Sequence, residues 1–484
     1  MALLLRTRWL SPLSLFVRRR RHPVPRAHRL RYRPRLDLLE PRLAPATFTV
    51  NDPGTDDLAN PQDHTAQTRN QTITLISALE QNEYDSGGDV IQFIGPMTIR
   101  VTDFTGLGDP AVPITIVGLK QGNDPGVTID HTSGGDQELI IGGGSSVSDL
   151  NLMNMGLWAY GDGCTIEDVY SIGGREGFSF ESNTTLDHCV VSGKTFGVIN
   201  PHEKDPAVRI GSGCTVQNCF IGTTPDGTGL LGNANADGLE VWGSNNTITH
   251  NVIAGSQFDG LDLYGDNNQV QGNRIGTDVT GTVALGNGWA GISVSGSHNL
   301  IGGSGGKGNI ISGNTFPVRA VSWGDGVDIN RGVGNIIQGN YIGTDASGTQ
   351  PLGNSDDGIV DYGSGTIIGG LGAGNVISGN GGNGIALIDA TGTIIQGNYI
   401  GTDINGTNPL GNGGVGVSIS AGPNNVIGAP IAGAGNLIDC NGRAGIFLGI
   451  GSNSVIVQGN YIGTNPAGAD LANQGSSITI NGSS

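Results

Sequence analysis

An eight-residue phrase that returns along the chain is the feature that most restricts its fold. It reads Gln-Gly-Asn-Tyr-Ile-Gly-Thr-Asp at 338–345, and near-copies occupy 271–278, 396–403 and 458–465, with a more degenerate copy at 217–224. Successive copies start 54, 67, 58 and 62 residues apart. A chain of this length would ordinarily form about three globular domains, but recurrence at such a period predicts one stacked repeat structure, a solenoid.

Glycine and short alternating apolar runs indicate that the repeated unit is built from β-strands. Glycine contributes 86 of 484 residues without a Gly-X-Y period, which excludes collagen. Strands of the form Gly-apolar-x-apolar start at Gly238, Gly260, Gly291, Gly326, Gly358, Gly384, Gly416 and Gly445. Because side chains alternate along a strand, the two apolar residues should face a core and the x residue should face outward.

Asparagine recurs in the same register, once in each aligned run. The aligned positions are Asn251, Asn273, Asn314, Asn340, Asn380, Asn398, Asn441 and Asn460. Asparagine tolerates the left-handed backbone conformation and its amide can satisfy the backbone at a bend, so we predict one structural ladder without chemistry. The longer intervals contain an insert, Ile-Gly-Thr-Asp…Leu-Gly-Asn, at 275–287, 342–354 and 400–412. These inserts should project from one corner of every second coil, about 10 Å apart.

The charge of the chain is divided between a basic start and an acidic body. Residues 1–42 hold 12 of the 24 basic side chains, all arginine, and the rest carries 12 basic and 40 acidic side chains, a formal charge of −28. Such a body should repel nucleic acid and attract cations. The apolar stretch Trp9–Val17 is too short to cross a bilayer, which needs about 20 residues. We interpret residues 1–46 as an arginine-rich export leader, with an incorrectly assigned start or a basic tail as the alternatives.

The remaining motifs resemble those of a known family. The Gly-Ile-x-Val strands, the Ile-Gly-Thr-Asp…Leu-Gly-Asn loops and the Asn-x-Ile-Ser-Gly-Asn runs, over about residues 140 to 480, are similar to bacterial right-handed parallel β-helix repeat proteins of the pectin-lyase-like fold, and residues 39–50 resemble the leader junction of the exported type. The resemblance implies an all-β, right-handed parallel β-helix and export to the cell surface or medium. It implies no single activity, because this fold hosts lyases, hydrolases, epimerases and adhesins.

The ends of the repeat region set the expected domain boundaries. Leu75, Ile76 and Leu79 give a short helix an apolar face that could cover the open end of the solenoid. We therefore expect a cap and first coils over 47–140 and the β-helix repeats over 141–484. The five cysteines form no CxxC or Cys/His cluster, which argues against zinc and against a disulfide framework. No segment of the body is apolar enough to span a membrane.

Acidic and aromatic residues concentrate where the strands differ from coil to coil. At the x position lie Glu240, Asp262 and Asp328; before the glycines lie Asp237, Asp259, Asp325 and Asp357; Asp361 adds another acid; and two positions after x lie Trp242, Tyr264 and Tyr362. Paired carboxylates can act as acid and base in glycoside hydrolysis, and aromatic faces can stack on sugar rings. Stacked carboxylates can also bind calcium, or they can form an ordinary solvated face.

These patterns leave two functional hypotheses open. The first is an exported protein without catalytic activity that binds glycan or a surface partner along its long face. The second is a polysaccharide-degrading enzyme, a hydrolase rather than a lyase, with Glu240, Asp262, Asp259 or Asp328 as catalytic groups and Trp242, Tyr264 and Tyr362 contacting substrate. For either, Asp237, Asp325, Asp357 and Asp361 are the candidate calcium ligands, and no other cofactor is predicted.

Overall fold

A computed structural model describes residues 44–102, 108–109, 111–122, 124–132, 137–175, 177–195, 206–315 and 324–482. The chain divides into two compact units, Met1–Ala44 and Pro45–Ser484, and the account below concerns the second. The expected leader over residues 1–46 lies almost entirely outside the described residues.

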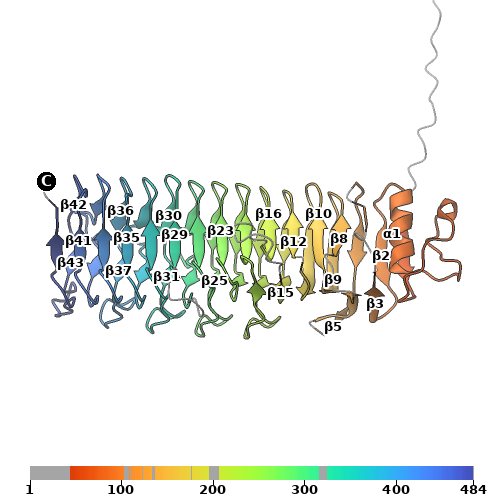
Figure 1. The fold of residues 1–484 in the computed structure, drawn as a ribbon, viewed down its shortest axis with the longest axis horizontal. Helices are drawn as coiled ribbons and strands as arrows, with labels where there is room; N and C mark the ends of the chain where they lie inside the picture. Colours follow the sequence, from red (N-terminus) through yellow and green to blue (C-terminus); the bar gives the residue numbers. More distant parts are fainter. Residues whose placement is uncertain are drawn as a thin grey trace, which may run out of the picture. The chain divides into compact units, whose positions relative to one another are not determined.

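The unit Pro45–Ser484 is a right-handed parallel β-helix, as the sequence predicted (Figure 1). One face is a 13-stranded parallel sheet. In spatial order its strands are β8 (Glu138–Ile141), β10 (Gly156–Ala159), β12 (Phe178–Phe180), β16 (Val208–Ile210), β20 (Leu239–Val241), β23 (Leu261–Leu263), β26 (Ile292–Val294), β29 (Val327–Ile329), β32 (Ile359–Asp361), β35 (Ile385–Leu387), β38 (Val417–Ile419), β41 (Ile446–Leu448) and β44 (Ile478–Ile480). All eight Gly-apolar-x-apolar runs form strands of this sheet, which confirms that prediction.

A 27-stranded sheet forms the other two faces as two rows. The first row holds β1 (Thr47–Val50), β2 (Val90–Phe93), β4 (Thr115–Val117), β13 (Thr185–Asp187), β17 (Thr215–Gln217), β21 (Thr247–Thr249), β24 (Gln269–Gln271), β27 (Leu300–Gly302), β30 (Ile336–Gln338), β33 (Ile367–Gly369), β36 (Ile394–Gln396), β39 (Val426–Ile427) and β42 (Ile456–Val457). The second row holds β3 (Met97–Val101), β7 (Val127–His131), β14 (Val190–Ser192), β18 (Phe220–Ile221), β22 (Val252–Ile253), β25 (Arg274–Ile275), β28 (Ile310–Ile311), β31 (Tyr341–Ile342), β34 (Val376–Ile377), β37 (Tyr399–Ile400), β40 (Leu437–Ile438) and β43 (Tyr461–Ile462). The long strands β9 (Ser146–Met153) and β11 (Thr165–Ile172) run through both rows.

The short helix α1 (Leu75–Tyr84) covers the end of the solenoid at β1 and β2 (Figure 1). Thr74 and Ser77 form a reciprocal capping box that satisfies backbone N–H groups at its start. Leu75 and Ala78 are fully buried against the core. The remaining elements are a short 3-10 helix (Pro61–Asp63) and two small ribbons, β5 (Lys120–Gln121) with β6 (Asp124–Pro125) and β15 (Lys194–Thr195) with β19 (Asn233–Ala234).

Asparagine stacks at all three corners of the coil, and not in the single ladder that the sequence suggested. One column is Asn251, Asn273, Asn309, Asn340, Asn375, Asn398, Asn436 and Asn460; a second is Asn287, Asn314, Asn354, Asn380, Asn412, Asn441 and Asn473; a third includes Asn246, Asn268, Asn299 and Asn335. The predicted ladder mixed the first two columns, because the run Asn-x-Ile-Ser-Gly-Asn has an asparagine at both corners. The structural role itself is confirmed.

The recurring phrase is explained by contacts between the insert and its own coil. The Tyr341 ring lies under Gly348, where an added Cβ would come within 3.0 Å of the ring and where φ is +65°. Asp345 Oδ1 accepts hydrogen bonds from the backbone N–H groups of Thr349 and Gln350, which confirms its role as a turn residue. Position 348 therefore requires glycine for two reasons: its φ is positive, and a Cβ would crowd the Tyr341 ring.

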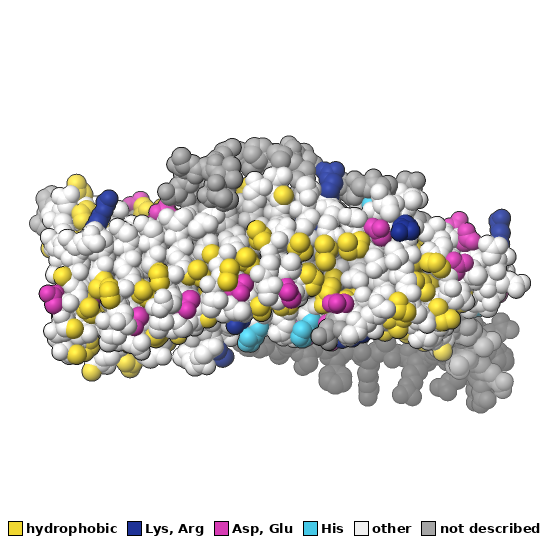
Figure 2. All heavy atoms as spheres, turned by 90° about the horizontal axis from the view of Figure 1, so that it is seen from below, with side chains coloured by type: hydrophobic (Ala, Val, Ile, Leu, Met, Phe, Trp, Pro, Cys, Tyr) yellow, Lys and Arg dark blue, Asp and Glu magenta, His cyan; other side chains and the backbone are white. Residues whose placement is uncertain are grey.

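The inserts also bond to one another across the interval of two coils, for which the strand spacing predicts about 10 Å. Ala346 N donates to Gly281 O at 2.9 Å, and Ile404 N donates to Gly348 O at 3.0 Å. These hydrogen bonds join the inserts into a second, outer stack beside the coils. On the face seen from below, Figure 2 shows a broken band of apolar side chains along the unit, with acidic side chains between them.

Candidate functional site

The acids predicted at the x position lie in one row on the outer face of the 13-stranded sheet. Strand pairing aligns Arg209, Glu240, Asp262, Ser293 and Asp328 on successive strands from β16 to β29. Glu240 is the strand partner of Asp262, and Asp262 is the strand partner of Ser293. The x positions therefore lie side by side, as the sequence predicted.

Burial separates this row from an ordinary solvated face. Glu240 and Asp262 are each only 3% exposed although they point away from the core. The aromatic rings of Trp242 and Tyr264 stack on each other beside these carboxylates. Their ring centroids lie 4.7 Å apart and the interplanar angle is 20°. Burial, followed by the charge of Asp262 and a hydrogen bond to it, raises the pKa of Tyr264 above its usual range. The carboxylates and the stacked rings therefore form one packed group.

Arg209 belongs to this group and was missed by the sequence reasoning. Its Nε donates to Glu240 Oε2 at 2.9 Å, which pairs the buried glutamate of the row with a cation from the neighbouring strand. The strand β16 has Ala207 where the later strands have glycine, so a search for Gly-apolar-x-apolar passed over it. A pattern that allowed any small residue at that position would have found it.

The aspartates that precede the strand glycines share a structural duty. In each, Oδ1 accepts the backbone N–H of the corresponding residue on the next coil: Asp237 from Asp259, Asp259 from Ala290, Asp325 from Asp357, and Asp357 from Asn383. Asn383 continues the column by accepting from Val415 N. One oxygen of each carboxylate is thus committed to the backbone.

Three carboxylates meet on neighbouring coils, those of Asp325, Asp356 and Asp357. Each offers an oxygen, and these oxygens all lie within 4.8 Å of one another. Burial and the charges of Asp356 and Asp357 raise the pKa of Asp325 to about 8, and burial raises that of Asp357 to about 6. Two of the predicted calcium ligands therefore come together, with Asp356 as a third that the sequence reasoning missed. Carboxylate oxygens are suitable calcium ligands.

Asp361 and Asp237 do not join that cluster. Asp361 aligns with Ile329 and Leu387, residues of the core, and it is fully buried. Its carboxylate accepts from Gly363 N at 2.8 Å and from the Thr393 hydroxyl at 2.9 Å. These bonds give Asp361 an internal structural role, on the opposite side of its strand from the outward row.

Asp328 has the least satisfied carboxyl group of the row. Its Oδ1 is buried and has no hydrogen-bond partner among the described residues. Burial, together with the charges of Asp259 and Asp361, raises its pKa to about 6. Tyr362, the third predicted aromatic contact, is 46% exposed just beyond strand β32, which neighbours the strand of Asp328. A carboxyl group with this pKa can hold or release a proton near neutral pH.

Comparisons with known proteins define no family for this chain. It matches no family model and no curated protein. Similar solved structures include a PL6 family polysaccharide lyase from Pseudopedobacter saltans (16% identity, 79% of this chain and 91% of that chain, TM-score 0.40) and the A-module of a mannuronan C-5 epimerase from Azotobacter vinelandii (14%, 90% and 99%, 0.33). A surface adhesin of Streptococcus pneumoniae is also similar (12%, 89% and 91%, 0.28). Among the described residues, no helix is long and apolar enough to cross a membrane.

Proposed function

We propose that this protein is exported and binds polysaccharide along the outer face of its 13-stranded sheet without cleaving it. The observation that carries the proposal is the stacked pair Trp242–Tyr264, with Trp242 56% and Tyr264 38% exposed, directly beside the buried carboxylates Glu240 and Asp262. An exposed aromatic surface can stack on the apolar face of a sugar ring, and adjacent carboxylates can accept hydroxyl hydrogen bonds. This combination suits a neutral sugar chain on an acidic protein.

Two of the candidate carboxylates favour binding over catalysis because they already have structural partners. Glu240 is held by Arg209, and Asp259 accepts a backbone N–H group from the next coil. The strongly acidic body makes nucleic acid an unsuitable partner.

Asp328 supports a second candidate function, a glycoside hydrolase. Its raised pKa of about 6 suits a general acid. Asp262 lies two strands away in the same row, which places the two carboxyl groups about 10 Å apart, near the upper end of the range for inverting enzymes. In this version Asp328 would protonate the leaving oxygen while Asp262 activates water.

One set of variants tests both candidates. In affinity electrophoresis through gels that contain neutral or acidic polysaccharides, the full chain should be retarded by at least one neutral polysaccharide. The variant Trp242→Ala should lose that retardation, and Tyr461→Ala, which removes a comparably exposed ring from the other sheet, should retain it. Equal retardation of all three proteins would refute the proposed face. Release of reducing ends that disappears in Asp328→Asn would decide for the hydrolase.

A further inference from the structure

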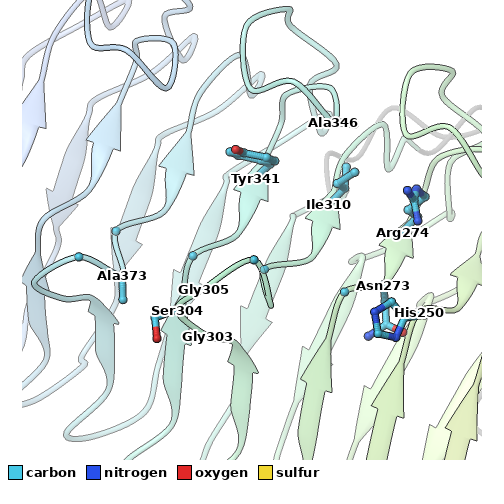
Figure 3. Close-up of a pocket in the computed structure, with 16 residues that line it drawn as sticks. His250, Asn273, Arg274, Gly303, Ser304, Gly305, Ile310, Tyr341, Ala346 and Ala373 are labelled. Atoms are coloured by element: carbon cyan, nitrogen blue, oxygen red, sulfur yellow. The ribbon is translucent and has the colours of Figure 1, made fainter.

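A pocket on the opposite side of the coil contains an arginine where the repeat calls for an aromatic residue. The pocket has a volume of about 430 Å³ and lies between the glycine-rich loop at 303–308 and the insert residue Ala346, above strands β25, β28 and β31 (Figure 3). The first residue of β25 is Arg274, whereas the corresponding residues of the other copies are Phe220, Tyr341, Tyr399 and Tyr461. An added Cβ at Gly281, the insert glycine that corresponds to Gly348, would lie 3.7 Å from Arg274 Nε, so the arginine occupies the place of the ring.

Arg274 lines the pocket, and its guanidinium group has no partner among the residues that the structure describes. Its Nε is buried and has no hydrogen bond, and across the described part of the chain no ion pair involves this side chain. Arg274 and His250 lie at the same end of the pocket (Figure 3). A buried donor without an acceptor is unfavourable, so an arginine kept in this state favours the binding of an anion.

The other residues that line the pocket indicate the shape and polarity of the ligand. Ile310 and the Tyr341 ring give an apolar floor, as Figure 3 shows. The opposite wall presents Ser304 and the exposed backbone of Gly305 and Gly306, where an added Cβ would meet no atom within 4 Å. A purely apolar ligand would leave these backbone groups without partners, whereas a hydroxylated ring would satisfy them.

We propose that this pocket binds an acidic sugar unit, with the carboxylate on Arg274 and one face of the ring over Ile310 and Tyr341. Arginine suits a carboxylate because its planar fork can donate two parallel hydrogen bonds. The site lies on the 27-stranded sheet and does not depend on the binding face proposed above, since Trp242 and Tyr264 extend from the 13-stranded sheet. A positive pocket on an acidic body would also select one charged unit from a longer chain at a defined place.

The test measures binding of glucuronate to the full chain by calorimetry. Glucuronate should bind, glucose and benzoate should bind much more weakly, and inorganic sulfate should compete only weakly because it gains nothing from the apolar floor. Arg274→Tyr, which restores the residue of the other repeats, should weaken glucuronate about tenfold to a hundredfold through loss of a charge-assisted contact. Arg443→Ala, which removes an exposed charge elsewhere, should leave it unchanged.

Several results would overturn the assignment. Undiminished glucuronate binding by Arg274→Tyr would place the carboxylate elsewhere, and absence of binding to the wild-type chain would refute the site. If benzoate bound as tightly as glucuronate, the loop backbone would not be forming hydrogen bonds with the sugar hydroxyl groups. Because Arg274→Tyr introduces a residue that the same fold already accepts at three positions, loss of folding is not expected, and an unchanged melting temperature would verify this.

Discussion

The asparagine columns should contribute a large share of local stability, and Asn340 offers the sharpest test. Its side chain is fully buried; Oδ1 accepts from the backbone N–H and the amide of Asn309, each at 2.9 Å, and Nδ2 donates to Ile301 O at 2.9 Å and to Asn375 Oδ1 at 3.0 Å. Asn340→Ala therefore leaves at least one buried N–H group and one buried carbonyl without partners. At about 1–3 kcal/mol for each orphaned group, the free energy of unfolding should fall by about 2–6 kcal/mol.

Guanidinium-induced unfolding measures that loss, and amide hydrogen exchange locates it. Solenoids can open locally, so exchange at Asn309 should accelerate even where the global transition shifts little. Gln269→Ala is the matched control, because Gln269 is exposed on the neighbouring row and should change stability by less than about 0.5 kcal/mol. A loss below about 1 kcal/mol with unchanged exchange at Asn309 would refute the reasoning, since it would mean that water replaces the amide without cost.

Three further outcomes follow from individual residues. Burial raises the pKa of Asp439 from 3.8 to about 7, so its contribution to folding is lost as pH rises through that value, and Asp439→Ser should raise the melting temperature at pH 8 but not at pH 4; equal shifts at both would contradict this. Gly348→Ala should destabilise by about 1–3 kcal/mol in denaturant unfolding, more than Gly372→Ala, which has a similar positive φ but no atom near its Cβ; equal effects would exclude the Tyr341 contact. If calcium binds the three clustered aspartates, it should raise the melting temperature of the wild type more than that of Asp356→Ala, and identical shifts would remove the site.

The sequence predicted those parts of the molecule that depend on short-range periodicity. The alternation in Gly-apolar-x-apolar places Leu261 and Leu263 in the core and Asp262 outside, and the strands lie in that orientation. The columns of asparagine were harder to assign, because the turns between strands vary and successive residues of the first column are 22 to 38 positions apart. Only stacking of whole coils decides that Asn314 and Asn340 occupy different corners.

The candidate sites show the same limit more strongly. The Arg209–Glu240 pair joins side chains 31 positions apart, and no local pattern announces it. Asp361 interrupts the alternation of its strand, and its position in the core depends on Thr393 from another coil. The pocket at Arg274 arises from a glycine-rich loop and an insert that meet only after stacking. Sequence supplied the candidate chemistry, while long-range contacts decided which groups are available.

The departures from the repeat are where function should be sought, because they carry a cost that stacking does not require. In most coils the repeat fixes the residue type, because the position belongs to an asparagine column, holds a ring beneath a glycine or faces the apolar core. A residue that departs from the repeat changes one of these contacts. Arg274 places a charged group where the next copy has the Tyr341 ring beneath its insert glycine, and Asp328 places a poorly satisfied carboxyl group where later coils have Val360 or Ala386. Natural proteins tolerate local losses of stability at functional sites. Restoring the repeat residue at either position should therefore raise stability while removing the binding that we assign to it, and a restoration that did neither would mark that exception as neutral variation.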